Sequence, residues 1–190
     1  MIRSWLAGVR VLDLGQYLPG PGAAQILADL GADVLKVERP AGDPLRALDP
    51  VTGKRVAGIS PYYAAVNAGK RVVRLDLKNE KDKRAFERLA AAADALIESF
   101  RPGALPKLGL GAEALRALNP RLVHVALSGY GQTGPLASQA GHDLNYLALT
   151  GALAASGPAA APAIAFPPIA DHASAMHAAL CVLGGLLGRA

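Results

Sequence analysis

The sequence predicts an α/β protein with a Rossmann-like, largely parallel sheet and flanking helices. Short apolar runs of strand type alternate along the chain with segments of helical periodicity, a pattern typical of βαβ units. The chain is also long enough to bury a substantial core, because 52% of its 190 residues are hydrophobic and only 18% are charged.

The first half of the chain contains two clear strand candidates. Residues 9–14 (VRVLDL) form an apolar run that ends at a glycine, the pattern of a buried strand. After the loop GQYLPGPG, residues 22–31 have helical periodicity, and residues 32–37 (ADVLKV) predict a second strand. Residues 41–69 show little periodicity, so we expect a long irregular stretch, which is usually functional or covered by another part of the molecule.

The second half continues the alternation. Residues 71–77 (RVVRLDL) alternate like a strand, and Asn79 is expected to cap a helix that runs to about residue 93. The later candidates follow in order: a strand at 95–98, a helix at 112–118, a strand at 121–127 and a helix from about His142.

Two parts are expected, a Rossmann-like domain over residues 1–170 and a terminal apolar helix over 171–190. The apolar run of this helix, residues 173–187, is shorter than the roughly 20 residues that a membrane span needs. Polar residues also interrupt its start. We therefore predict a buried helix that lacks its partner segment, with an exposed helix that binds another surface as the alternative, and no membrane association.

Composition narrows the possible partners. The net charge is +5, but only 5% of residues are aromatic and the cations form no stripe, so no nucleic-acid partner is predicted. Between residues 78 and 88, cations and acids are mixed, which is typical of a solvated helix face. The single Cys181 excludes a disulfide within the chain and fits a reducing cytoplasm.

A dinucleotide site is one interpretation of the first βαβ unit, which ends in the acidic Glu38. The glycines do not support it, because Gly15, Gly20 and Gly22 form no G-x-G-x-x-G and two prolines stiffen the turn. A connection shaped by Pro and Gly is the better interpretation, and an NAD-linked oxidoreductase stays as a minor alternative.

Four stretches of the chain stand in series: VLDLGQYLPGPGAAQILADLGADVLKVERP, NAGKRVVRLDLK, DALIESFRPGALPKLGLG and SGYGQTGPLASQAGHDLNYLALTG. Together they resemble the family III CoA-transferases, a family that also contains the 2-methylacyl-CoA racemases. The resemblance covers nearly the whole chain. It implies coenzyme A as part of an acyl-CoA substrate, a carboxylic acid as second substrate, and no metal.

The resemblance places the coenzyme A contacts in loops at the ends of the predicted strands. Lys and Arg are the charge-assisted donors that the phosphates need. The residues assigned by position are Gln16, Tyr17, Leu18, Arg39, Lys70, Arg71, Ser99, Phe100 and Lys107.

Asp171 is the catalytic residue that the resemblance implies. In transferases of this family, an aspartate at this place attacks the acyl-CoA thioester and forms an anhydride, then an aspartyl-CoA thioester. Such chemistry needs an ionised carboxylate beside an apolar pocket and backbone amides. Asp171 precedes a long apolar helix, where a carboxylate is stabilised. From the residues alone, a plain helix cap is equally compatible.

The motif GHDLNY contains His142, the second catalytic candidate. In the racemase branch, the histidine of this motif and the aspartate flank the α-carbon as two bases, and imidazole exchanges protons near neutral pH. Asp143 is expected to be a supporting residue or a helix cap. Pro167 and the residues 172–175 depart from the racemase pattern, so the transferase is preferred.

Members of this family are much longer than this chain. The resemblance therefore implies an N-terminal half, with the family's linker and small domain absent and a homodimer or a second chain as partner. A catalytically silent CoA-binding half-enzyme that needs a second chain stays as an alternative to both activities.

Overall fold

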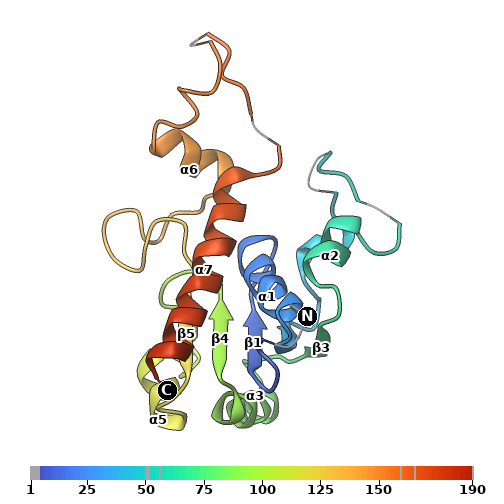
Figure 1. Ribbon diagram of the computed structural model, residues 1–190, viewed down its shortest axis with the longest axis vertical. Helices are drawn as coiled ribbons and strands as arrows, with labels where there is room; N and C mark the ends of the chain where they lie inside the picture. Colours follow the sequence, from blue (N-terminus) through green and yellow to red (C-terminus); the bar gives the residue numbers. More distant parts are fainter. Residues whose placement is uncertain (1–4, 50–51, 56, 159, 165, 190) are drawn as a thin grey trace.

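The sheet has five parallel strands in the order β3-β2-β1-β4-β5 (Figure 1), so the predicted fold class is confirmed. This computed structural model describes residues 5–49, 52–55, 57–158, 160–164 and 166–189. The strands are β1 (Arg10–Leu14), β2 (Asp33–Glu38), β3 (Arg71–Arg74), β4 (Ala95–Glu98) and β5 (Val123–Ala126).

Both edge strands end earlier than the sequence pattern predicts. β3 ends at Arg74, because its neighbour β2 ends at the paired residue Glu38. In the same way β5 ends at Ala126, which pairs with Glu98 at the end of β4. An edge strand has one neighbour to pair with, so the length of that neighbour limits the ladder even where the apolar alternation continues.

Helices cover both faces of the sheet, as a parallel sheet requires. On one face α1 and α7 pack on residues such as Val11 and Ile97. On the other face α3, α4 and α5 cover Leu12 and Leu96. The helices are α1 (Pro19–Asp29), α2 (Pro61–Val66), α3 (Glu80–Ala92), α4 (Ala104–Lys107), α5 (Ala112–Leu118), α6 (Asp143–Leu149) and α7 (Ile169–Gly188), with a 3-10 helix, η2, at Pro44–Ala47.

The terminal apolar helix, α7, begins at Ile169, two residues before the expected boundary at 171. Small residues on one side let it lie close to α1, where a Cβ added to Gly22 would be 3.1 Å from the Cβ of Ala175. Its opposite side is exposed, including Met176 and Leu180 at 59% and 63%. By length and hydropathy α7 would also suffice to cross a membrane, but its packed side is part of the main core.

The segment 41–69 is more regular than expected. The carboxylate of Asp43 accepts the N–H of Leu45 at 2.9 Å and caps η2, and Pro61 begins α2. Proline suits the start of a helix because no intrahelical partner is needed for its nitrogen. These are start signals that the lack of apolar periodicity concealed. Residues 50, 51 and 56 of this segment lie outside the described residues.

Four charged side chains are enclosed beneath the loop that follows β1. The Nζ atom of Lys36 lies 3.1 Å from Oδ2 of Asp43 and 3.8 Å from Oδ2 of Asp13. The Nζ atom of Lys70 lies 2.8 Å from the same oxygen of Asp13. None of the four side chains is exposed, and the two cations balance the two carboxylates, which is the condition for burying ions.

This charge network also holds the loop between β1 and α1. Lys36 donates to the carbonyl of Gly15 at 2.8 Å, and the carboxylate of Asp13 accepts the N–H of Gly15 at 2.8 Å. Lys70 donates to the carbonyl of Pro21 at 2.7 Å. The shape of the loop therefore depends on charges from separate segments of the chain.

We expect Lys36→Met to lower the free energy of unfolding by about 3–5 kcal/mol, because it leaves the buried carboxylate of Asp43 without its cation. Urea unfolding followed by circular dichroism measures the change. Lys81→Met, the same substitution on the exposed side of α3, is the matched control and should change stability by less than about 0.5 kcal/mol. Equal midpoints for both variants would contradict the role given to the network.

Candidate active site

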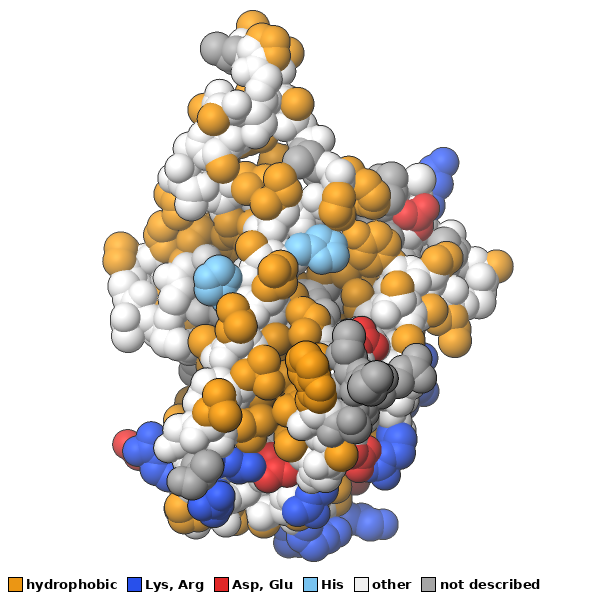
Figure 2. Space-filling view, in the orientation of Figure 1, with side chains coloured by type: hydrophobic (Ala, Val, Ile, Leu, Met, Phe, Trp, Pro, Cys, Tyr) orange, Lys and Arg blue, Asp and Glu red, His pale blue; other side chains and the backbone are white. Residues whose placement is uncertain are grey.

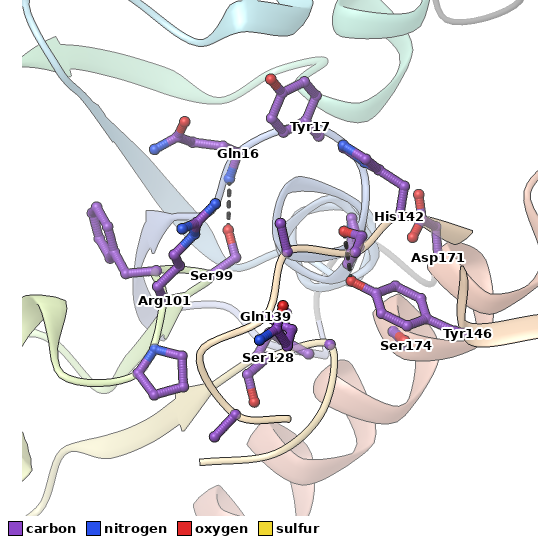
Figure 3. A pocket seen from close by; sticks show the side chains of 18 residues that line it. Gln16, Tyr17, Ser99, Arg101, Ser128, Gln139, His142, Tyr146, Asp171 and Ser174 are labelled. Atoms are coloured by element: carbon purple, nitrogen blue, oxygen red, sulfur yellow. Dashed lines mark hydrogen bonds between the residues drawn. The ribbon is translucent and has the colours of Figure 1, made fainter. Parts of the chain in front are cut away.

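A cavity of about 480 Å³ opens at the carboxyl edge of the sheet. The strand order reverses between β1 and β4, and ligands of such sheets bind in the crevice at this point. Loops after β1, β4 and β5 line the cavity together with α6 and α7 (Figure 3). Its polar lining residues are Gln16, Tyr17, Ser99, Arg101, Ser128, Gln139, His142, Tyr146, Asp171 and Ser174.

The loop after β1 is held in a tight turn. Gly15 has no room for a side chain, because an added Cβ would lie 2.6 Å from the Cα of Gly20. Tyr17 has a φ of 60°, in the left-handed region that few non-glycine residues adopt. The N–H of Gln16 donates to Oγ of Ser99 at 3.0 Å and ties this loop to the loop after β4. The turn therefore presents Gln16 and Tyr17 at the crevice.

Asp171 lies in the first turn of α7 and is half-buried in the cavity wall. The carboxylate of Asp143 accepts the backbone N–H groups of Ala170 and Asp171 at 2.6 and 3.1 Å. Asp143 is therefore a cap, as expected, although it caps α7 from its own place at the start of α6. Burial and the nearby Asp143 charge raise the pKa of Asp171, while His142 acts in the opposite direction.

His142 stands next to Asp171 on the same wall of the cavity (Figure 3). The backbone N–H of His142 donates to Oδ1 of Asn145 at 2.9 Å, and this bond fixes the start of α6. The imidazole meets the ring of Tyr17 edge-on, with 5.8 Å between the ring centres. The predicted pair of His142 and Asp171 therefore lies in one cavity, with the imidazole supported by an aromatic ring rather than by a carboxylate.

Tyr146, the last residue of GHDLNY, contacts the first residue of the motif, Gly141, and requires a glycine there. Its hydroxyl donates to the carbonyl of Gly141 at 2.7 Å, and its ring leaves no room for a side chain on Gly141 or Gly129. Tyr130 packs edge-on against the same ring. Burial and the charge of Asp171 raise the pKa of Tyr146. Sequence reasoning missed this residue, although its fixed distance from Gly141 was a signal.

A second cavity, of about 260 Å³, adjoins the first, and Gln16 and Phe100 line both. It lies beyond the carboxyl ends of β1, β2 and β3. Its lining combines apolar side chains with two cations and three acids: Arg39, Lys78, Glu38, Asp43 and Asp76. The sequence pattern had assigned Lys78 to a solvated helix face, but it precedes α3 and lines this cavity instead.

The structure brings most of the predicted site residues to these two cavities. The first contains Gln16, Tyr17, Ser99, Phe100, His142 and Asp171, and the second contains Arg39. Leu18 is buried beside Leu45 and Tyr63, beneath the loop rather than on the cavity wall.

Three predicted phosphate contacts lie elsewhere. The ammonium of Lys70 is enclosed in the charge network, where three acceptors already surround it. Arg71 begins β3 and pairs with Asp33 at 2.7 Å, at the amino edge of the sheet, opposite the cavities. Lys107 is exposed on α4 and lines neither cavity. Both residues stand at or just before the start of β3, and the acids that engage them come from segments far away in the sequence.

Lys and Arg side chains on the face shown in Figure 2 gather mainly at its lower end, where α3 and α5 lie in Figure 1, while apolar side chains occupy the middle and upper parts. The basic surface on this face is thus concentrated away from the carboxyl edge of the sheet.

Glu38 is engaged within the protein. Its carboxylate accepts from Nε of Arg46 at 2.8 Å and from the hydroxyl of Tyr63 at 2.7 Å. Burial by itself would raise the pKa of Glu38, but these hydrogen bonds outweigh burial and lower the pKa. A dinucleotide site would need this carboxylate for a ribose hydroxyl. The geometry therefore disfavours the NAD alternative.

Glu98, the last residue of β4, was not among the predicted site residues. It is buried, and its Oε2 atom accepts the N–H of Phe100 at 2.6 Å. Burial raises its pKa to about 7, although this hydrogen bond acts in the opposite direction. In the part of the chain that the structure describes, no group of three or more His, Cys, Asp or Glu is arranged to hold a metal ion.

The sheet order and the cavity at the reversal point define a doubly wound α/β protein with a ligand site at the carboxyl edge of its strands. Residues 6–190 match the family described as CoA-transferase family III. The chain belongs to this family, as the sequence motifs indicated.

Relatives with names or solved structures support the assignment. The succinate–glutarate CoA-transferase of Agrobacterium fabrum is 39% identical over 187 residues, which are 96% of this chain and 47% of that protein. A CAIB/BAIF family protein from Brucella suis superimposes with a TM-score of 0.89 at 36% identity, over 97% of this chain and 49% of its own. A hypothetical protein from Mycobacterium tuberculosis superimposes with a TM-score of 0.86 at 41% identity, over 97% of this chain and 51% of its own. The chain thus spans about half the length of the relatives it matches.

Asp143→Asn should lower the pKa of Asp171, because the amide oxygen still caps α7 while the neighbouring negative charge is removed. A pH titration of the side-chain carboxyl carbon of Asp171 by NMR measures it. Asp29→Asn, an exposed position on α1, is the control and should leave the midpoint unchanged. If Asp143→Asn also left it unchanged, the charge of Asp143 would have no influence on Asp171.

Proposed function

We propose that this chain is the CoA-binding half of a CoA-transferase, in which Asp171 is the nucleophile that accepts an acyl group. The observation that carries the proposal is the position of the Asp171 carboxylate. It lies half-buried at the start of α7, in a cavity at the reversal point of the sheet, beside a second cavity whose lining includes Arg39 and Lys78. The family assignment and the transferase names of the relatives support the same class of reaction.

Coenzyme A would span the two cavities. Its phosphates need cationic donors, and its adenine needs an apolar surface. The second cavity offers both, with Arg39 and Lys78 beside Leu75, Leu77 and Leu108. Gln16 and Phe100 line both cavities, so the pantetheine arm would pass between them to bring the thioester to Asp171.

The proposed reaction conserves the thioester through covalent intermediates on Asp171. A carboxylate oxygen attacks the thioester carbon, the C–S bond breaks and the CoA thiolate leaves, which gives a mixed anhydride. The thiolate then attacks the aspartyl carbonyl and releases the donor acid as its carboxylate. The acceptor carboxylate then attacks the aspartyl-CoA thioester and displaces the thiolate, which gives a second mixed anhydride. The thiolate attacks the acceptor's carbonyl carbon in this anhydride, which forms the new acyl-CoA and frees the Asp171 carboxylate.

The elevated pKa of Asp171 bears on this chemistry. Burial and the charge of Asp143 disfavour the ionised form, so the carboxylate that does form is poorly solvated and more nucleophilic. The dipole at the start of α7, where Asp171 lies, favours developing negative charge at the reacting carbon. His142 would complete the polar wall around the thioester.

A 2-methylacyl-CoA racemase is the second candidate. It is favoured by the one cavity that contains both His142 and Asp171, since racemisation needs a base on each face of the α-carbon. Asp171 is near enough to interact with the imidazole electrostatically, but among the described residues no carboxylate hydrogen-bonds to it, which suits a general base less well than the usual oriented histidine.

Completion by further polypeptide is part of the proposal. The exposed side of α7 carries Met176, Leu180 and Leu187, and the relatives are about twice as long as this chain. We infer that the remaining half, or a partner chain, covers this side. If so, the isolated chain would bind coenzyme A and turn over slowly or not at all.

Hydroxylamine should trap the proposed intermediate. Incubation with succinyl-CoA and hydroxylamine is expected to convert Asp171 to the hydroxamate, which mass spectrometry of the peptide from α7 detects. Asp171→Asn should abolish the product, because the amide is not a nucleophile, whereas Asp29→Asn should leave it unchanged. The trial is run with and without the C-terminal half of the Agrobacterium fabrum relative, because the proposal includes completion by further polypeptide.

The competing activities give different results in the same trial. Absence of hydroxamate in both mixtures, with binding of CoA intact, would overturn the nucleophilic role of Asp171. Incorporation of solvent deuterium at the α-position of a 2-methylacyl-CoA, with no acceptor acid present, would establish the racemase instead. Calorimetry that shows no binding of CoA would contradict the proposed function as a whole.

A further inference from the structure

The turn after β4 connects the two cavities. Ser99, Phe100 and Arg101 line the larger cavity, and Phe100 also lines the smaller one. The position of the Phe100 backbone therefore affects the shape of both. Two side-chain hydrogen bonds hold this turn: Oγ of Ser99 accepts from Gln16, and the N–H of Phe100 donates to Glu98. The carbonyl of Arg101 also accepts the N–H of Ala104, and the Phe100 side chain packs against the core.

Glu98 holds the turn from behind. Its side chain is only 7% exposed and lines neither cavity, so it does not reach a ligand there. At 2.6 Å, its bond to the N–H of Phe100 is short, as expected for a hydrogen bond to an ionised carboxylate. A neutral carboxylic acid would accept the same N–H much more weakly.

His124 faces the other carboxyl oxygen of Glu98. Its buried Nε2 atom has no hydrogen-bond partner within the part of the chain that the structure describes, and it lies 3.9 Å from Oε1 of Glu98. The two side chains share one face of the sheet, because His124 pairs with Leu96 in the register of β4 and β5. Among the described residues, His124 is the ionisable group within ion-pair distance of Glu98. The neighbouring core on this face is apolar, with Leu12, Leu14 and Leu96.

This surrounding makes the charge of Glu98 sensitive to pH. Burial raises the pKa of Glu98 to about 7, and burial lowers the pKa of His124. Above about pH 7, Glu98 is ionised and its bond to Phe100 is charge-assisted. Below that pH, a proton on the carboxyl removes the charge and weakens the bond.

We propose that Glu98 is a positioning residue, whose ionised carboxylate holds the Phe100 turn between the two cavities and whose protonation loosens it. Glu98 acts through the backbone of Phe100 and touches no substrate. The consequence for affinity, weaker binding of coenzyme A at lower pH, rests on the proposed function. The consequence for the turn itself does not.

The backbone amide of Phe100 reports the state of the turn directly. In the full 190-residue chain labelled with ¹⁵N, its chemical shift should titrate with a midpoint near pH 7. Glu98→Gln, which is neutral at every pH, should abolish this titration. Glu113→Gln, the same substitution at an exposed position on α5, should leave it intact. An amide of Phe100 that does not titrate between pH 5 and 9 in the unaltered protein would overturn the proposal.

Calorimetry with coenzyme A then tests the link to the ligand. The ratio of the dissociation constant of Glu98→Gln to that of the unaltered chain cancels the titration of the CoA phosphates and of Asp171 and His142. We expect this ratio to rise about fivefold from pH 6 to pH 8, the difference between a charged and a neutral hydrogen bond. A constant ratio would overturn the link between Glu98 and affinity. If Phe100 titrates while neither protein binds CoA, the positioning role stands and the proposed function fails.

Discussion

The enclosed pairing of Lys36 and Lys70 with Asp13 and Asp43 is the constraint on which the cavity depends. The four charges come from two strands, the turn after β2 and the segment before β3. Each buried ion is strongly unfavourable without its partners. The four segments must therefore meet in one arrangement, and that arrangement defines the course of the loop after β1.

Contacts between single pairs of residues connect this loop to the other segments that line the cavity. Gln16 bonds to Ser99 of the next loop, and the ring of Tyr17 supports His142. Asp143, next to His142, caps the helix that carries Asp171. Each candidate catalytic group is thus held by a residue from a different segment. These contacts between segments give the cavity its shape.

Several features of the site followed from the sequence with little help. The apolar runs and their flanking glycines predicted the strands of the sheet, and a parallel sheet has its ligand site at the carboxyl edge. His142 was identified from the GHDLNY motif and Asp171 from the family resemblance, and both lie in one cavity. Asp143 was expected to be a supporting residue or a helix cap, and it caps α7. The fold predictions are confirmed because they depend on local chemistry or on a rule that holds for every sheet of this type, while the catalytic roles of Asp171 and His142 stay predictions.

Other features of the site depended on tertiary contacts that no local pattern reveals. Lys70 and Arg71 are neighbours in the chain, but one is enclosed beneath the cavity loop and the other lies at the amino edge. Lys78 was interpreted as part of a solvated helix, yet it lines the second cavity. Glu98 was not predicted to be a site residue, because a single acidic residue at a strand end belongs to no recognisable sequence motif.

The sequence by itself determined the fold class, the family and the two candidate catalytic residues, because periodicity and motif order are properties of the chain read in one direction. The tertiary structure alone decided which cations face a ligand and which neutralise buried acids. It also decided that Glu98 lies against His124 behind the Phe100 turn. The physical reason is that the burial of a charge, and therefore its cost and its partners, depends on segments far apart in the sequence.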